Sequence, residues 1–140
     1  MFQYRPKHLN QLHSWYSQKT SKGQMGFLSF EQFEKWYSER DKECFYCGIK
    51  EEDCQFIAMT GLLKSKRFPK NGIPGQGTSR CVWLEIDRKN PNEKYSIENC
   101  ELCCYFCNND KSDVFDDNQY KEFMQNRAGF LRRLINTHRN

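Results

Sequence analysis

The sequence contains no apolar run long enough to cross a bilayer, and its mean hydropathy is negative. A membrane-spanning helix needs about 20 consecutive apolar residues. The first residues also lack the continuous apolar segment of a signal peptide. We therefore expect a cytoplasmic protein without a membrane partner, in a reducing compartment where disulfide bonds are rare.

Histidine is scarce, with three residues in 140. His8, His13 and His138 lie near the two ends of the sequence, far from the polar motif described below. We expect them on a helix face or at the surface. The alternative is that His8 or His13 folds back to supply a metal ligand or a base.

Acidic residues are absent from three segments, residues 1–30, 61–84 and 123–140, each of which carries several lysines or arginines. The net charge is nevertheless only +4, because acids concentrate between Glu31 and Asp53. If the three segments share one face, they form a surface that binds a polyanion. The alternative is a set of solvated basic side chains with no partner.

The length of 140 residues and the aromatic content of 15% predict a single domain, residues 1–140, with an aromatic core. Its helical N-terminal part is expected over residues 1–40, with helices at about 7–20 and 30–40, where aromatic side chains recur at helical spacing. Ser29 is the expected N-cap of the second helix, and a short helix is expected from Glu51 to Met59.

A stretch rich in glycine and proline follows, from Gly61 to Ser79. It is too long for a simple connection within a small domain, which is typical of a functional or mobile loop. We expect it to contact the backbone of a nucleic acid through four basic residues: Lys64, Lys66, Arg67 and Lys70.

Alternating apolar side chains predict a strand over residues 82–87, and a second short strand is expected at 100–103. A short helix should begin after the second strand. A C-terminal helix is expected from Asp116 or Asp117 through Ile135, within residues 114–140. The chain is therefore of the α+β class, with the order strand, loop, strand, helix at its centre.

Two CxxC pairs, Cys44 with Cys47 and Cys104 with Cys107, can supply four thiolates to one tetrahedral zinc ion. Such a zinc ion would join segments distant in sequence. Positions three apart in a strand face opposite ways, so the pair at positions 100 and 103 is poorly placed to share an ion. Four cysteines are therefore expected as core thiols, with a second zinc site as the alternative: Cys54, Cys81, Cys100 and Cys103.

Three polar residues beside the zinc pairs suggest a site for phosphate chemistry. Asp87 at a strand end and Asn108 after the last cysteine offer oxygen ligands to Mg²⁺ or Mn²⁺, and Lys111 lies one helical turn beyond Asn108. Lys111 could hold a phosphate oxygen. Taken singly, each also has an ordinary structural role, as a turn cap, a local hydrogen-bonder or a solvated lysine.

The segment 84–113 resembles the motif of HNH (ββα-metal) nucleases, in which Asp-His closes the first strand and CxxCN followed by Lys opens the metal-binding helix. The resemblance implies a small zinc-stapled ββα-metal core over residues 44–113. It also implies that Asp87 and Asn108 are the ligands of the catalytic metal. Asn99 corresponds to the asparagine that braces the connecting loop.

Arg88 occupies the position where most HNH nucleases have their catalytic histidine, and a guanidinium does not accept a proton under ordinary conditions. The Asp-Arg pair with Tyr95 eight residues after the Asp, the following Ser-x-x-Asn and the upstream CxYCGI are similar to a rare-cutting restriction endonuclease of the family. That resemblance implies that Arg88 contacts the scissile phosphate or the attacking water, and that Tyr95 orients or activates the nucleophile.

The sequence as a whole predicts a metal-dependent endonuclease for double-stranded DNA, with structural Zn²⁺ and catalytic Mg²⁺ or Mn²⁺. A site-specific type II restriction enzyme is the leading interpretation. Because one short site cuts one strand, we expect a homodimer. The alternatives are a nicking or homing nuclease from a phage or mobile element, and a zinc-stapled DNA-binding module without activity.

Overall fold

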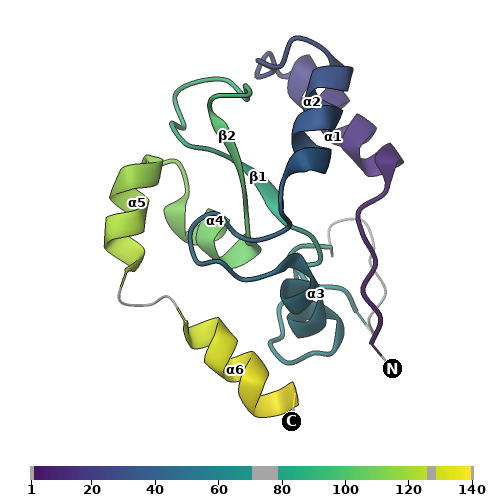
Figure 1. Cartoon of the computed structure of the whole chain (residues 1–140), viewed down its shortest axis with the longest axis vertical. Coiled ribbons are helices and arrows are strands. Elements are labelled where there is room, and N and C mark those ends of the chain that lie inside the picture. Colours follow the sequence, from purple (N-terminus) through teal and green to yellow (C-terminus); the bar gives the residue numbers. More distant parts are fainter. Residues whose placement is uncertain (1, 71–78, 126–128, 140) are drawn as a thin grey trace.

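The computed structural model describes residues 2–70, 79–125 and 129–139. Within these ranges the chain forms six helices and two strands, so the predicted α+β fold is confirmed. The elements are α1 (Leu9–Ser21), α2 (Phe30–Glu39), α3 (Glu51–Met59), β1 (Glu85–Arg88), β2 (Cys100–Cys103), α4 (Tyr105–Lys111), α5 (Asp117–Met124) and α6 (Phe130–Arg139). Figure 1 shows α1 and α2 at one end of the molecule and α6 at the other.

The two N-terminal helices pack through aromatic side chains. The hydroxyl of Ser29 accepts a hydrogen bond from the backbone N–H of Gln32 at 3.1 Å, so Ser29 is the N-cap of α2, as predicted. Phe33 is completely buried and stacks on Trp15, with 4.9 Å between ring centroids. The aromatic residues of these helices therefore form part of the core, where they support the segment that follows β1.

The two strands pair antiparallel, with Asp87 opposite Glu101, and α4 packs against β1 (Figure 1). One residue, Cys104, separates β2 from α4 and is the N-cap of that helix. The predicted order of strand, loop, strand and helix is therefore present.

The strand β1 is shorter than the sequence predicts, because it begins at Glu85 rather than at residue 82. Two buried side chains of α3 bind the preceding backbone: Glu51 accepts from the N–H of Leu84 at 2.9 Å, and Gln55 donates to the carbonyl of Val82 at 3.2 Å. These backbone groups are bonded to α3 and so take no part in the ladder with β2.

The prediction of one continuous C-terminal helix is wrong. The structure has two helices, α5 and α6, and Gly129 before α6 has a φ of +104°. This conformation is outside the range of a right-handed helix and is available chiefly to glycine. The break lets α6 return to the α3 region, where Arg139 forms an ion pair with Asp53 at 2.9 Å.

Buried apolar side chains from α1, α2, α3, the two strands, α4, α5 and α6 form one continuous cluster. This cluster includes seven of the eight cysteines, and Cys47 packs against it. Among the helices of the described ranges, none has the length and apolar character that crossing a membrane requires.

Candidate active site and metal centre

Four cysteines from two distant segments form a group suited to a metal ion. The sulfur atoms of Cys44, Cys47, Cys104 and Cys107 all lie within 4.8 Å of one another, and those of Cys47 and Cys104 are 3.8 Å apart. Zinc bound tetrahedrally with Zn–S distances of about 2.3 Å places its ligand sulfurs roughly 3.8 Å apart. The donor set therefore fits a structural zinc ion.

The backbone already holds these sulfurs in place. The Sγ of Cys44 accepts from the N–H of Cys47 at 3.5 Å, and the Sγ of Cys104 accepts from the N–H of Cys107 at 3.4 Å. Hydrogen bonds from the thiols of Cys104 and Cys107 lower the pKa of the Cys44 thiol. The hydrogen bond with Cys107 raises the pKa of the Cys104 thiol by contrast. The close placement of the four sulfurs, and not their pKa values, therefore favours metal binding.

The remaining cysteines lie outside this group. Cys100 and Cys103 are in β2, and every cysteine of the chain lies in the described ranges, which contain one group of potential metal ligands. The four other thiols are fully or almost fully buried among apolar side chains: Cys54, Cys81, Cys100 and Cys103.

Asp87 in β1 is buried, with 5% of its surface exposed. Its Oδ2 accepts from the hydroxyl of Tyr46 at 2.7 Å, and its Oδ1 lies 3.4 Å from the ammonium of Lys111. Burial raises the pKa of the Asp87 carboxyl, while the hydrogen bond from Tyr46 and the charge of Lys111 oppose that rise. Both neighbours favour the carboxylate form and fix its orientation.

The side chain of Lys111 lies in a different environment from the one that the sequence predicts, in which it would hold a phosphate oxygen. Its side chain is completely buried, and its ammonium donates to the backbone carbonyl of Arg88 at 2.8 Å as well as contacting Asp87. A phosphate in solvent-accessible space cannot reach this group. In the structure Lys111 is a positioning residue for the end of β1.

Asn108 in α4 faces the same strand. Its Nδ2 donates to the Oε1 of Glu85 at 2.7 Å, and Glu85 also accepts two hydrogen bonds from Arg80, at 2.6 and 2.8 Å. Because the amide nitrogen is held by Glu85, the orientation of the Asn108 amide is fixed. Its Oδ1 makes no hydrogen bond with any residue in the described ranges and is available to a cation.

Asp87 and Asn108 line a small cavity of about 140 Å³ together with Arg88 and Tyr95. The guanidinium of Arg88 lies 4.8 Å from the centre of the Tyr95 ring, and its Nη1 donates to the carbonyl of Glu93 at 3.3 Å. Four of the residues that the sequence assigns to catalysis or metal binding therefore meet at one place.

Both backbone groups of Tyr95, its N–H and its carbonyl, form hydrogen bonds with the segment that follows α1. Its N–H donates to the carbonyl of Gln24 at 2.9 Å, and its carbonyl accepts from Gly26 at 2.6 Å. Its ring contacts Trp15, with 5.1 Å between ring centroids. Burial raises the pKa of the Tyr95 phenol, and the charge of Arg88 opposes this rise. The phenol is therefore protonated at neutral pH in the folded chain.

Asn99 lies outside the cavity and closes the connection between β1 and β2. Its Oδ1 accepts from the N–H of Asn90 at 2.9 Å, and its Nδ2 donates to the carbonyls of Asn90 and Lys94 at 3.1 and 2.9 Å. Asn99 therefore braces the loop that carries Tyr95.

Sequence reasoning missed two residues of the site, Tyr46 and Glu85. Tyr46 lies between Cys44 and Cys47. Glu85 precedes Asp87 by two positions in the same strand, so the side chains of Glu85 and Asp87 point to the same face of the sheet. The spacing of Glu85 and Asp87 in the sequence was therefore a signal that could have identified Glu85. The hydrogen bond of Tyr46 depends on the approach of a segment about 40 residues away.

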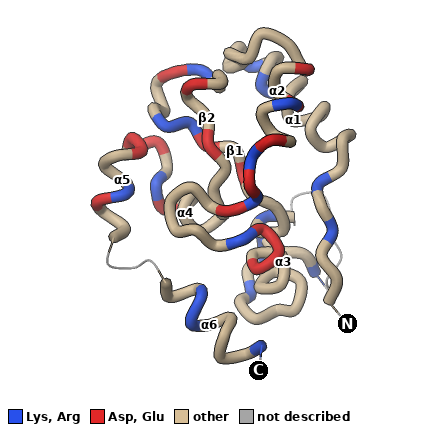
Figure 2. The backbone as a smooth tube through the Cα atoms, in the orientation of Figure 1, with Lys and Arg blue, Asp and Glu red and all other residues tan. Residues whose placement is uncertain are grey.

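The four basic residues of the 61–70 segment are exposed, and none of them lines the Asp87 cavity. Arg67 lines a different cleft, together with Arg80 and Glu85. Figure 2 shows the basic residues of the N-terminal segment and those of α6 on different sides of the molecule, so these two acid-free segments do not form one continuous patch in this view. Residues 71–78 of the predicted loop lie outside the described ranges.

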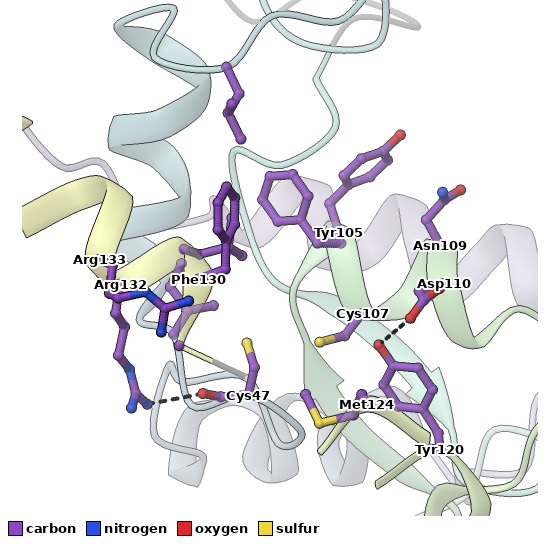
Figure 3. A pocket seen from close by; sticks show the side chains of 15 residues that line it. Cys47, Tyr105, Cys107, Asn109, Asp110, Tyr120, Met124, Phe130, Arg132 and Arg133 are labelled. Atoms are coloured by element: carbon purple, nitrogen blue, oxygen red, sulfur yellow. Dashed lines mark hydrogen bonds between the residues drawn. The ribbon is translucent and has the colours of Figure 1, made fainter. Parts of the chain in front are cut away.

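A cavity of about 570 Å³ is lined mainly by apolar side chains of α4, α5 and α6, and Asp87 and Asn108 are not among its lining residues (Figure 3). At its edge Arg132 donates to the carbonyl of Cys47 at 3.0 Å. This contact joins α6 to the cysteine turn.

Neither the models of known protein families nor the curated proteins contain a match to this sequence. Among solved structures, the chain is similar to the rare-cutting HNH restriction endonuclease PacI, which was described with an extraordinary mechanism of DNA perturbation. The TM-score is 0.63 at 21% sequence identity, over 85% of this chain and 75% of that chain. The chain therefore shares the fold of PacI.

Proposed function

We propose that this chain is a metal-dependent endonuclease that hydrolyses phosphodiester bonds in double-stranded DNA, and that it acts as a type II restriction enzyme. The observation that carries the proposal is the shared cavity of Asp87, Asn108, Arg88 and Tyr95. The fold likeness to PacI, an HNH restriction endonuclease, supports the nuclease assignment.

The oxygen donors fit a hard divalent cation. A carboxylate from Asp87 and an amide oxygen from Asn108 are ligands of the type that Mg²⁺ and Mn²⁺ prefer, and two protein ligands leave positions open for phosphate and water. Such a cation supplies charge stabilisation to the phosphate and to the leaving 3′-oxygen. Tyr46 and Lys111 orient the carboxylate, and Glu85 orients the amide.

The other side chains of the cavity bind and orient the reactants. Arg88 presents a planar cation that can bind a phosphate oxygen with two N–H groups. Tyr95 places its hydroxyl at the same cavity. This hydroxyl orients the attacking water, or its deprotonated form accepts a proton from that water. Asn99 keeps Tyr95 in place through the loop brace. The exposed Lys64, Lys66 and Lys70 contact the DNA backbone further away.

The four cysteines hold a structural Zn²⁺ that fixes α4 to the Cys44 turn. Because Asn108 directly follows Cys107 in α4, zinc binding also fixes the metal ligand of the active cavity. One site of this size cuts one strand, so cleavage of both strands uses two protomers related by a two-fold axis. Sedimentation of the purified protein with and without duplex DNA tests for this homodimer.

The deciding experiment is digestion of a supercoiled plasmid with zinc-loaded protein and Mg²⁺ or Mn²⁺. We expect metal-dependent linearisation that is lost in Asp87→Ala and retained in Glu98→Gln, a matched change at an exposed carboxylate of the same β1–β2 connection. Fragments of fixed length from bacteriophage DNA support restriction. Single nicks would point instead to a nicking or homing enzyme.

Arg88 at the position of the usual catalytic histidine is the observation that favours a second candidate, a zinc-stapled DNA-binding module without activity. Binding of duplex DNA without any cleavage, with either divalent cation and over a wide pH range, would replace the nuclease proposal with this one.

A further inference from the structure

A second cleft, of about 510 Å³, adjoins the candidate active site at Glu85. Glu85 lines this cleft, and its carboxylate binds the amide of Asn108, which lines the active cavity. Asp87 and Glu85 are two residues apart in one strand, so their backbones are separated by roughly 6.6 Å. The two cavities are therefore close neighbours.

Three cations from separate segments line this cleft: Lys7, Arg67 and Arg80. The N-terminal segment is fixed at Arg5, whose backbone N–H and carbonyl both bond to the side chain of Gln55, at 2.8 and 2.9 Å. The indole N–H of Trp83, which also lines the cleft, donates to the same carbonyl at 2.9 Å. These bonds bring Lys7 to the cleft.

The other two cations are joined through the backbone. The N–H of Arg80 donates to the carbonyl of Arg67 at 2.9 Å. The guanidinium of Arg80 lies over the ring of Tyr105, 4.7 Å from its centre, while binding Glu85. The arrangement is therefore built from fixed elements.

The charges in the cleft do not balance. Arg80 is neutralised by Glu85, whose two oxygens are occupied by Arg80 and Asn108. The side chains of Lys7 and Arg67 make no hydrogen bond or ion pair with any residue in the part of the chain that the structure describes. Lys7 is also partly buried, and burial lowers the pKa of its ammonium, against the charges of Glu51 and Glu85. These carboxylates lie too far from Lys7 to form a direct ion pair in the described residues, so a bound anion would further stabilise the partly buried ammonium.

We propose that the cleft is a phosphate-binding subsite, in which Lys7 and Arg67 hold a backbone phosphate of the DNA strand next to the one in the active cavity. The inference rests on the proposed function and extends it. The position of the cleft beside Asn108 favours a polynucleotide over a free phosphate ion, because a DNA strand bound in the active cavity would continue past Glu85. The contact positions the strand and reads no sequence.

The test measures binding of a labelled duplex of mixed sequence by fluorescence anisotropy, with zinc-loaded protein, no other divalent cation, and salt from 50 to 200 mM. Each phosphate contact contributes about 0.9 to the slope of log affinity against log salt. Lys7→Gln with Arg67→Gln should reduce that slope by roughly 2, whatever the duplex sequence. Lys7→Arg with Arg67→Lys should restore it.

The matched control is Lys35→Gln with Lys50→Gln, which removes the same formal charge from two exposed lysines outside the cleft and should leave the slope unchanged. If the glutamine double variant fails to fold, Arg67→Gln alone decides, with an expected reduction of about 1, because its side chain is exposed. An unchanged slope, or a fall equal to that of the control, overturns the subsite.

Two further outcomes separate the possible explanations. If inorganic phosphate at constant ionic strength abolishes the difference between wild type and variant without displacing the duplex, the cleft binds free phosphate and the polynucleotide assignment is wrong. A reduced slope in a protein that never cuts DNA keeps the subsite and removes the nuclease proposal. A wild-type protein that binds no DNA overturns both.

Discussion

Lys111 and Asp87 form an ion pair beneath the candidate active site in which the lysine is completely buried and the aspartate nearly so, with 3.4 Å between Nζ and Oδ1. A buried pair of this kind is costly to form and more costly to break, because removing one partner leaves an uncompensated buried charge. The pair therefore connects the stability of the fold with the orientation of a proposed metal ligand.

Replacing Lys111 with Met should destabilise the protein by about 3–5 kcal/mol, since Asp87 then loses its cation. Urea denaturation measures the change. Lys35→Met is the control: Lys35 pairs with Glu39 at an exposed site, where such pairs contribute about 0–1 kcal/mol. Equal effects of the two substitutions would contradict the structural role of Lys111.

Removing zinc should unfold the core around α4. Metal analysis is expected to return one zinc per chain, and Cys107→Ser should lose that zinc with a large fall in thermal midpoint. Cys100→Ala should keep one zinc, because Cys100 is buried outside the group of four. A second zinc that disappears in Cys100→Ala would show that β2 also binds metal.

The cleavage rate should rise with pH if the Tyr95 phenol removes a proton from water. Burial raises the pKa of Tyr95, so the reactive phenolate is scarce at neutral pH and grows about tenfold for each pH unit below that pKa. Tyr95→Phe should slow cleavage about 10²-fold or more and flatten the pH profile, while DNA affinity is kept. A tyrosine that only orients water would leave the slope of the profile unchanged in Tyr95→Phe.

Arg88→Ala should slow cleavage through a different effect, the loss of a cation at the phosphate, which is worth about 2–4 kcal/mol in comparable sites. The rise of the cleavage rate should then move to higher pH, because the positive charge of Arg88, which lowers the pKa of Tyr95, is also lost. Arg88→Lys restores the charge but not the planar group. Wild-type rates in Arg88→Ala would remove Arg88 from the active site.

Gly26→Ala should disturb Tyr95 without touching the active cavity directly. A Cβ at position 26 would lie 2.8 Å from the carbonyl oxygen of Tyr95, which is too close for two unbonded atoms. The backbone pairing of the two segments must then shift, at a cost of about 1–3 kcal/mol. Slower cleavage with unchanged zinc content is the expected result, and an unaffected enzyme would argue against the importance of this pairing for Tyr95.

The cysteine spacing and the residues around Asp87 were sufficient to predict the zinc group and the strand–loop–strand–helix order. Each CxxC turn and each strand end is determined by residues close in sequence, although the two turns meet only in the folded chain. The aromatic spacing of α2 and its Ser29 cap were predictable for the same reason.

The remaining features depend on contacts distant in sequence. The late start of β1 follows from bonds made by Glu51 and Gln55 of α3, and the burial of Lys111 depends on the carboxylate it meets in β1. The helix break at Gly129 was visible as a glycine, but its φ of +104° is a property of the folded chain. The hydrogen bond from Tyr46 to Asp87 joins residues 41 positions apart and likewise forms only in the folded chain.

The ribosome makes the two halves of the zinc group at different times. Cys47 and Cys104 are 57 residues apart, so at 5–20 residues per second the first pair of thiols waits roughly 3–11 s for the second. Asn108 is added immediately after Cys107. The group of four cysteines and the proposed metal ligands Asp87 and Asn108 are therefore completed almost together. A nascent chain that ends before α4 therefore lacks both Cys107, which completes the group of four thiols, and Asn108, the proposed second ligand of the catalytic metal.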